Sequence, residues 1–172
     1  MPMGQAPHRD IEQDPGAEVR VRLCDYAVAP DERLTLSRLE VDRPGPSYTV
    51  DTLRLLRERS PDHELTLVLG ADQAAQLRSW HEPEAVMSLA TVAVAAREGH
   101  EQKAVLRRLE GLPGGERIAF FDMPRIDVSS TLVRERAATG RPIRYLVPDD
   151  VADYVRANRL YGATVPVNRP AS

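Results

Sequence analysis

Hydrophobic residues recur along the chain in two patterns, one typical of helices and one typical of strands. Apolar side chains three or four positions apart predict amphipathic helices. Short apolar runs rich in β-branched residues predict buried strands. The helices are expected over residues 18–29, 47–58, 71–76, 82–89, 101–109, 131–139 and 151–160. The strands are expected over residues 34–41, 65–69, 91–96 and 117–121.

The predicted helices and strands alternate, which favours an α/β fold with a mostly parallel sheet and helices on both faces. We expect one domain over residues 1–162 and a flexible tail over 163–172, whose few apolar residues are interrupted by prolines. Asp149 or Asp150 is the expected N-cap of the last helix. Because ligands of such sheets bind at the carboxyl ends of the strands, chemistry is expected in the segments that follow them.

A short polar turn follows the predicted strand at 65–69. Gly70 lets a ligand approach the backbone closely, and Asp72 either accepts hydrogen bonds from a ribose or caps the next helix. Trp80, the only tryptophan, comes soon after, where it either stacks on a flat aromatic ligand or packs half-buried. His81 is expected to be a solvent-facing loop residue.

A run of three hydroxyl residues gives the most complete candidate site, at the start of the helix predicted over 131–139. Free backbone N–H groups and the helix dipole at Ser129, Ser130 and Thr131 favour an anion. Arg134, one turn into the helix, can point back at the same anion. Phosphate binding and ordinary capping by Ser and Thr both fit this pattern.

Two further segments are weaker candidates. Arg9, in the run Pro7-His8-Arg9 near the N-terminus, is either a second anion contact or a plain surface-loop residue. Thr49 opens the helix predicted over 47–58 behind Ser47 and Tyr48. Its hydroxyl either holds a small ligand group or caps that helix.

The charge balance narrows the partners. The chain has 23 basic and 26 acidic residues, a net charge of -3, which weighs against nucleic acid and against a polybasic membrane contact. Lys103 is the only lysine, so any phosphate-binding cation is an arginine, whose planar fork suits phosphate. No apolar run reaches the roughly 18 residues that span a membrane, and the first residues lack signal-peptide features. A cytoplasmic protein is expected.

Several common types of site are missing from the sequence. Cys24 is the only cysteine, and the four histidines lack the spacing of metal ligands, so no metal site of the protein itself is expected. The chain has no G-x-x-x-x-G-K-S/T loop, no G-x-G-x-x-G and no G-x-S-x-G. P-loop hydrolysis, dinucleotide-dependent redox chemistry and serine hydrolysis are therefore disfavoured.

Four segments resemble the motifs of one family, in the same order along the chain. Residues 43–53 resemble R-x-G-x-S-Y-T-x-D-T-L, and residues 67–72, followed by Trp80, resemble G-x-D…W. Residues 128–134 resemble I-S-S-T-x-I-R, and residues 145–161 resemble Y-L-V-P-x-x-V-x-x-Y…L-Y. Over about residues 1–162 the chain therefore resembles bacterial nicotinate-nucleotide adenylyltransferases, of the nucleotidyltransferase superfamily with a Rossmann-like fold.

The resemblance implies an activity in NAD biosynthesis. The family transfers the adenylyl group of ATP to nicotinic acid mononucleotide, giving nicotinic acid adenine dinucleotide and pyrophosphate. Mg2+ assists this reaction. By this resemblance Trp80 stacks on the nicotinate ring, Thr49 helps to hold the same substrate, and Arg134 has the catalytic role. The resemblance also implies a set of residues that bind the nucleotide: Arg9, Gly70, Asp72, Ser129, Ser130, Thr131 and Arg134.

The front of the chain departs from the family. The family begins with a strand and a G-x-F-D-P-x-H-x-G-H loop, and Met1-Pro2 aligns only with the end of its second strand. The fold is thus expected to be N-terminally incomplete, with its first strand missing. Either the start is internal to a longer gene of a normal enzyme, or the chain is a catalytically inactive, truncated nucleotide-binding remnant. Tyr48-Thr49 and Trp80 disfavour the related phosphopantetheine adenylyltransferases. The sequence leaves a homo-oligomer open.

Overall fold

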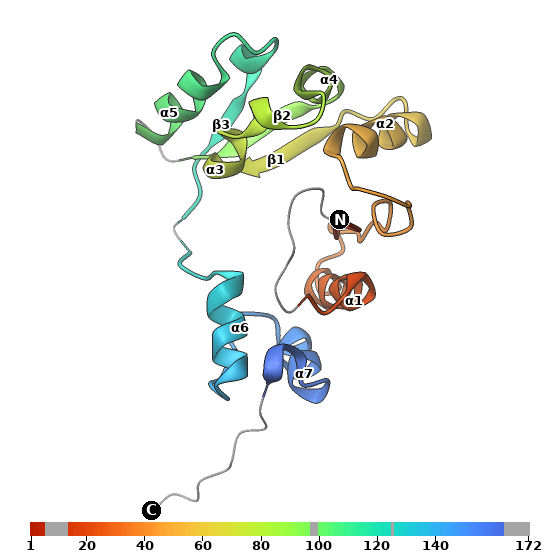
Figure 1. The fold of residues 1–172 in the computed structure, drawn as a ribbon, viewed down its shortest axis with the longest axis vertical. Coiled ribbons are helices and arrows are strands. Elements are labelled where there is room, and N and C mark those ends of the chain that lie inside the picture. The colour runs from red at the N-terminus through yellow and green to blue at the C-terminus, as the bar shows by residue number, and fades with distance from the viewer. Residues whose placement is uncertain (6–13, 97–99, 125, 164–172) are drawn as a thin grey trace, which may run out of the picture. The chain divides into compact units, whose positions relative to one another are not determined.

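The chain divides into two compact units, each with its own hydrophobic core. The computed structural model describes residues 1–5, 14–96, 100–124 and 126–163 (Figure 1). Residues 47–125 form one unit, called here the sheet unit, and residues 1–46 with 126–172 form the other, the helical unit. Within the described ranges, no helix is both long and apolar enough to cross a bilayer. Most of the expected tail lies outside the described residues.

In the part of the chain that the structure describes, the sheet unit contains all three strands, together with four helices and two 3-10 turns. In chain order its elements are α2 (Thr49–Arg59), β1 (Thr66–Gly70), α3 (Ala71–Ala74), η1 (Leu77–Ser79), α4 (Pro83–Leu89), β2 (Thr91–Ala95), α5 (His100–Leu109), η2 (Gly115–Arg117) and β3 (Ala119–Phe121). The strands pair in parallel in the order β1-β2-β3, as Figure 1 shows. The parallel sheet and these helices confirm the sequence prediction.

The core of the sheet unit lies against one face of the sheet. Val92 and Val94 of β2 are 1% and 0% exposed, and the register places Leu69 and Phe120 beside Val94 on the same face. Apolar side chains of α2, α3, α4 and α5 complete this core. On the opposite face Val68 is 62% exposed. The helices described in the sheet unit therefore cover only one of the two faces that were expected to carry helices.

The described residues of the helical unit form three helices around a smaller core. They are α1 (Ala17–Val28), α6 (Ser130–Ala138) and α7 (Asp149–Ala157), with the 3-10 turn η3 (Leu160–Gly162) after α7. The ring of Tyr26 on α1 packs against the ring of Tyr154 on α7, with centroids 5.5 Å apart. Cys24 of α1 is a half-buried free thiol. All three helices were predicted from the sequence, α1 from the spacing of its apolar residues and the other two chiefly from the residues at their ends.

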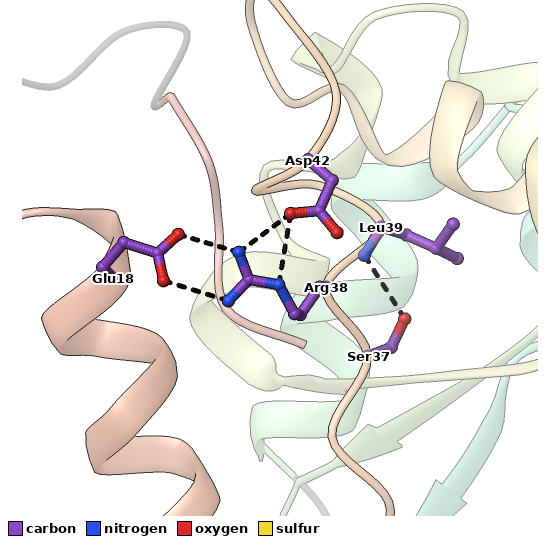
Figure 2. A network of polar contacts seen from close by, with 5 residues as sticks. All are labelled: Glu18, Ser37, Arg38, Leu39 and Asp42. Atoms are coloured by element: carbon purple, nitrogen blue, oxygen red, sulfur yellow. Dashed lines mark hydrogen bonds and ion pairs between the residues drawn. The ribbon is translucent and has the colours of Figure 1, made fainter.

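The strand predicted over residues 34–41 is wrong, because residues 34–38 have no regular secondary structure and residues 39–41 form a turn. The backbone N–H of Asp42 donates to the carbonyl of Arg38 at 2.9 Å, which reverses the chain where the strand was expected to continue. Leu34 is 53% exposed, so the alternating leucines do not bury one face. The Arg38 guanidinium also bonds the carboxylates of Asp42 and Glu18, the latter on α1 (Figure 2).

The expected N-cap of the last helix is also wrong. Pro148 occupies the N-cap position with φ -53° and ψ 150°, and no side chain caps the helix. The fixed φ of proline already suits this position, so the helix begins directly behind it. Asp149 and Asp150 lie inside the first turn, where their negative charges stabilise the positive end of the helix dipole.

The Arg38 network gives a first testable expectation. The hydrogen bonds from Arg38 lower the pKa of Glu18, so the carboxylate is favoured in the folded protein. The network therefore stabilises the helical unit at pH values above the ordinary pKa of a glutamate. This contribution is lost as the pH falls through the lowered pKa of Glu18. Arg38→Gln should lower the melting temperature at neutral pH and low salt. The difference from wild type should shrink in acid and in high salt.

A matched variant controls for the loss of one positive charge. Arg108→Gln removes an exposed arginine of α5 that has none of these contacts, so its melting temperature should stay close to that of the wild type. Equal melting temperatures for Arg38→Gln and wild type at low salt and neutral pH would contradict a stabilising role for the network.

Candidate functional site

The carboxyl end of β1 presents an open backbone and a free carboxylate. Gly70 closes the strand in an extended conformation, with φ -77° and ψ 159°, and α3 begins at the next residue. Apart from its chain neighbours, no atom of the described residues lies within 4 Å of a Cβ placed on Gly70, so the space in front of this backbone is open. Asp72 is exposed in the first turn of α3 and does not cap that helix, whose N-cap residue is Gly70. The capping interpretation of Asp72 is therefore wrong, and its contact with a ribose stays a prediction.

The first turn of α2 lies beside the residues that link η1 to α4. The Tyr48 and His81 rings are in contact, with centroids 4.5 Å apart and planes inclined by 37°. This contact brings the neighbouring residues Thr49 and Trp80 into the same region of the sheet unit. Thr49 is the first helical residue of α2, and the helix has no side-chain cap at its N-cap residue, Tyr48. Plain capping therefore does not explain Thr49.

Trp80 has both a packed side and an accessible side. Its backbone N–H donates to the carbonyl of Leu77 at 3.0 Å, which fixes it at the end of η1. Its half-buried side chain packs against the core of the sheet unit. The packing interpretation is therefore correct as far as it goes, and the accessible part remains available for stacking. His81 is exposed, as predicted.

The start of α6 carries the hydroxyl residues and the arginine for which anion binding was predicted. The Ser129 hydroxyl accepts a hydrogen bond from the N–H of Leu132 at 3.1 Å, which confirms that this serine caps the helix. Ser130 and Thr131 are exposed in the first turn. The Arg134 Nη2 donates to the Thr131 hydroxyl oxygen at 3.4 Å, so the guanidinium points back toward the helix start, as predicted.

The electrostatics of this helix terminus also favour the predicted binding of an anion. Each of the other described α-helices has an acidic residue in its first turn, whereas α6 has none. The first turn of α6 therefore supplies no carboxylate to the positive end of its dipole. Burial raises the pKa of Tyr161, in η3, while the positive charge of Arg134 opposes that rise. The phenol thus stays neutral at physiological pH and adds no negative charge next to Arg134.

An ion pair that the sequence did not predict lies close to Trp80. Arg54 of α2 bonds the Glu82 carboxylate through both of its terminal nitrogens, at 3.1 and 2.6 Å. These hydrogen bonds lower the pKa of Glu82. Glu82 has the left-handed backbone conformation, with φ 49° and ψ 60°. The partners are 28 positions apart in the sequence, so local patterns do not reveal the pair, and the only local signal is an acidic residue before Pro83.

The predicted site residues are distributed over both units. Thr49, Gly70, Asp72 and Trp80 belong to the sheet unit. The three hydroxyl residues and Arg134 belong to the helical unit. Arg9 lies outside the described residues. Within the described ranges, no three His, Cys, Asp or Glu side chains gather closely enough to hold a metal ion.

Comparison with known proteins places these residues in a family context. A family model described as cytidylyltransferase-like matches residues 1–136. A probable nicotinate-nucleotide adenylyltransferase of Corynebacterium kroppenstedtii is 38% identical over 161 residues, which cover 94% of this chain and 74% of that protein. One of Leifsonia xyli is 40% identical over 145 residues, covering 84% of this chain and 70% of that protein.

Solved structures show the same fold at low sequence identity. The nicotinic acid mononucleotide adenylyltransferase of Plasmodium falciparum, complexed with NaAD, superposes with a TM-score of 0.68 and 18% identity. The match covers 91% of this chain and 80% of that one. A second structure of the same protein, complexed with APC, has a TM-score of 0.67 and covers 88% of this chain and 78% of that one.

Proposed function

Because the chain belongs to the nicotinate-nucleotide adenylyltransferase family, we propose that it transfers the adenylyl group of ATP to nicotinic acid mononucleotide. The products are nicotinic acid adenine dinucleotide and pyrophosphate. The observation that carries the proposal is identity of 38% over 94% of the chain, in a range that includes the Trp80 segment and the α6 terminus. The open carboxyl end of β1 supports it, since ligands bind at this edge of such sheets.

The sheet unit supplies the site for the acceptor substrate. We assign Trp80 to stacking on the pyridine ring, because its side chain is anchored on one side by the core and accessible on the other. Thr49, at the amino end of α2, is assigned to the polar groups of the same substrate. Gly70 and Asp72 are assigned to the nucleotide, with Asp72 accepting hydrogen bonds from a ribose.

The helical unit supplies the phosphate contacts. In the reaction a phosphate oxygen of the mononucleotide forms a bond to the α-phosphorus of ATP, the bond from that phosphorus to the β-phosphate bridge breaks, and pyrophosphate leaves. Such a transfer needs alignment and stabilisation of charge, and no covalent nucleophile. We assign the leaving pyrophosphate to the backbone N–H groups of Ser130 and Thr131 and to the guanidinium of Arg134. Arg9 is assigned to the same phosphates by the sequence resemblance.

Magnesium belongs to this proposal as a companion of ATP. Mg²⁺ is bound mainly through substrate phosphates and water, with few protein carboxylates. When bound, the ion neutralises phosphate charge, and none of the steps above is assigned to it.

Two measurements on the 172-residue chain test the proposed function. Pyrophosphate release from ATP should depend on added nicotinic acid mononucleotide, with pantetheine phosphate as the negative control. The mononucleotide alone should quench the fluorescence of Trp80, the only tryptophan. Quenching without pyrophosphate release would make the chain a non-catalytic nucleotide-binding protein of the same fold. If the chain showed neither response, the assignment of this substrate would be wrong.

Trp80 gives a prediction on affinity. Trp80→Ala should weaken binding of nicotinic acid mononucleotide by about two- to tenfold, because an aromatic stacking pair contributes about 0.5–1.5 kcal/mol. Titration calorimetry measures this without a fluorescent side chain. Trp80→Phe keeps a stacking ring and should lie nearer to wild type. Equal affinity of Trp80→Ala and wild type would show that the tryptophan only packs.

A further inference from the structure

We propose that the Arg54–Glu82 ion pair is a positioning device that holds Trp80 beside the first turn of α2 and thereby sets the affinity for the pyridine ring of the substrate. The inference rests on the function proposed above. It concerns two residues that do not touch the substrate in that proposal and that act through the link between η1 and α4.

The link from Trp80 to Glu82 is short and is fixed at both ends. At its start, the Trp80 N–H is bonded to the Leu77 carbonyl, and Leu77 is completely buried. At its end, Pro83 begins α4, and the carbonyl of Glu82 accepts the first helical hydrogen bond, from the N–H of Val86 at 3.1 Å. These hydrogen bonds fix the two ends of the link. The path of the backbone between the ends depends on the contacts of the side chains of His81 and Glu82.

Two side-chain contacts tie this path to α2. The His81 ring lies against the Tyr48 ring, and the Glu82 carboxylate is held by two parallel hydrogen bonds from Arg54. A paired arginine fork fixes direction as well as distance. Asp51 lies 3.7 Å from Arg54 and restrains the guanidinium from the side of α2. Consecutive residues of the link, next to Trp80, are thus attached to the helix that begins at Thr49.

The backbone conformation of Glu82 indicates that a glutamate occupies this position because of its side chain. The left-handed conformation disfavours residues other than glycine, and asparagine or aspartate tolerate it better than glutamate does. Glutamate is nevertheless found there, with its carboxylate fully engaged by Arg54. An ordinary surface ion pair, such as Arg33 with Asp31, joins residues two positions apart and connects no separate elements.

The test uses the full chain and the single tryptophan as its probe. Glu82→Gln and Arg54→Gln each remove one charge at nearly constant size, and the double variant removes the pair. Asp31→Asn is the matched control, because it breaks an exposed arginine fork elsewhere in the chain. Acrylamide quenching of Trp80 in the ligand-free protein, and the dissociation constants of nicotinic acid mononucleotide and ATP, are measured for each variant. Circular dichroism verifies that each is folded.

The expected result has three parts. Acrylamide should reach Trp80 more readily in both single variants. The dissociation constant for nicotinic acid mononucleotide should rise by about two- to fivefold, the range that an exposed ion pair can supply, while that for ATP stays constant. The double variant should resemble the single variants, because each partner acts through the other. Glu82→Gly, which relieves the backbone and removes the carboxylate, should also weaken mononucleotide binding.

Several outcomes would overturn the inference or separate it from its premise. Unchanged quenching and unchanged mononucleotide affinity would overturn it, as would an equal loss of affinity for both ligands or an equal effect of Asp31→Asn. Wild-type mononucleotide affinity in Glu82→Gly would show that the backbone alone matters and would also overturn it. If the wild-type chain bound no mononucleotide while quenching still rose in both variants, the proposed function would fail and the positioning of Trp80 would stand.

Discussion

Replacing Arg134 by alanine is expected to weaken ATP binding by about 10- to 150-fold. A hydrogen bond to a charged group contributes about 1.5–3 kcal/mol, and this guanidinium is already directed at the start of α6 by its bond to Thr131. The same arginine is assigned to the leaving pyrophosphate, so any turnover should fall at least as far. Titration calorimetry with ATP measures the binding loss directly.

Two variants make the Arg134 experiment specific. Arg134→Lys keeps the positive charge and loses the planar fork, so its affinity should lie between those of wild type and alanine. Arg141→Ala removes an exposed arginine beyond the other end of α6 and should leave ATP binding unchanged. If Arg134→Ala bound ATP as tightly as wild type, the phosphate assignment of the α6 terminus would be wrong.

Leu77→Ala is expected to destabilise the sheet unit by about 2–5 kcal/mol. Its side chain is fully buried in η1, within the core beneath the sheet, and truncation there loses apolar contacts and leaves a cavity. A loss of this size is a large part of the stability of a typical domain. Urea unfolding followed by Trp80 fluorescence measures it, and because Trp80 lies in the sheet unit, the signal reports on that unit.

Leu106→Ala is the matched control for this prediction. Leu106 lies on α5 and is 43% exposed, so the same chemical change should cost roughly less than 1 kcal/mol, since alanine is also the better helix former. Similar unfolding midpoints for the two variants would mean that Leu77 is not a support of the core.

Leu77→Ala should also affect ligand binding, because Leu77 anchors Trp80. We expect it to raise the dissociation constant of nicotinic acid mononucleotide more than that of ATP.

Local patterns were sufficient for most of the secondary structure. The run from Leu65 to Gly70 is apolar, β-rich and closed by a glycine, and it forms β1. The three hydroxyl residues before Leu132 mark the start of α6, and Ser129 caps it. Failure came where side chains distant in sequence, or a proline, decided the outcome. Arg38 bonds to Glu18 of α1 and to Asp42, and the turn it joins replaces a strand that leucine spacing alone favoured.

The candidate site divides along the same line. Trp80, Asp72 and Arg134 could be chosen from residue type and from their place after a strand or at a helix start. The Arg54–Glu82 pair could not be chosen in this way, because its partners lie on different elements. They come within bonding distance only when α2 packs beside α4. The direction of Arg134 was predictable, since residues three apart in a helix lie on one face.

The division into two units has an experimental consequence. The chain has one tryptophan, Trp80 in the sheet unit, and one cysteine, Cys24 in the helical unit. An acceptor dye attached to that thiol forms a unique donor–acceptor pair with the indole, without any change to the sequence. The efficiency of energy transfer then reports the separation of the two units in solution, before and after each substrate is added.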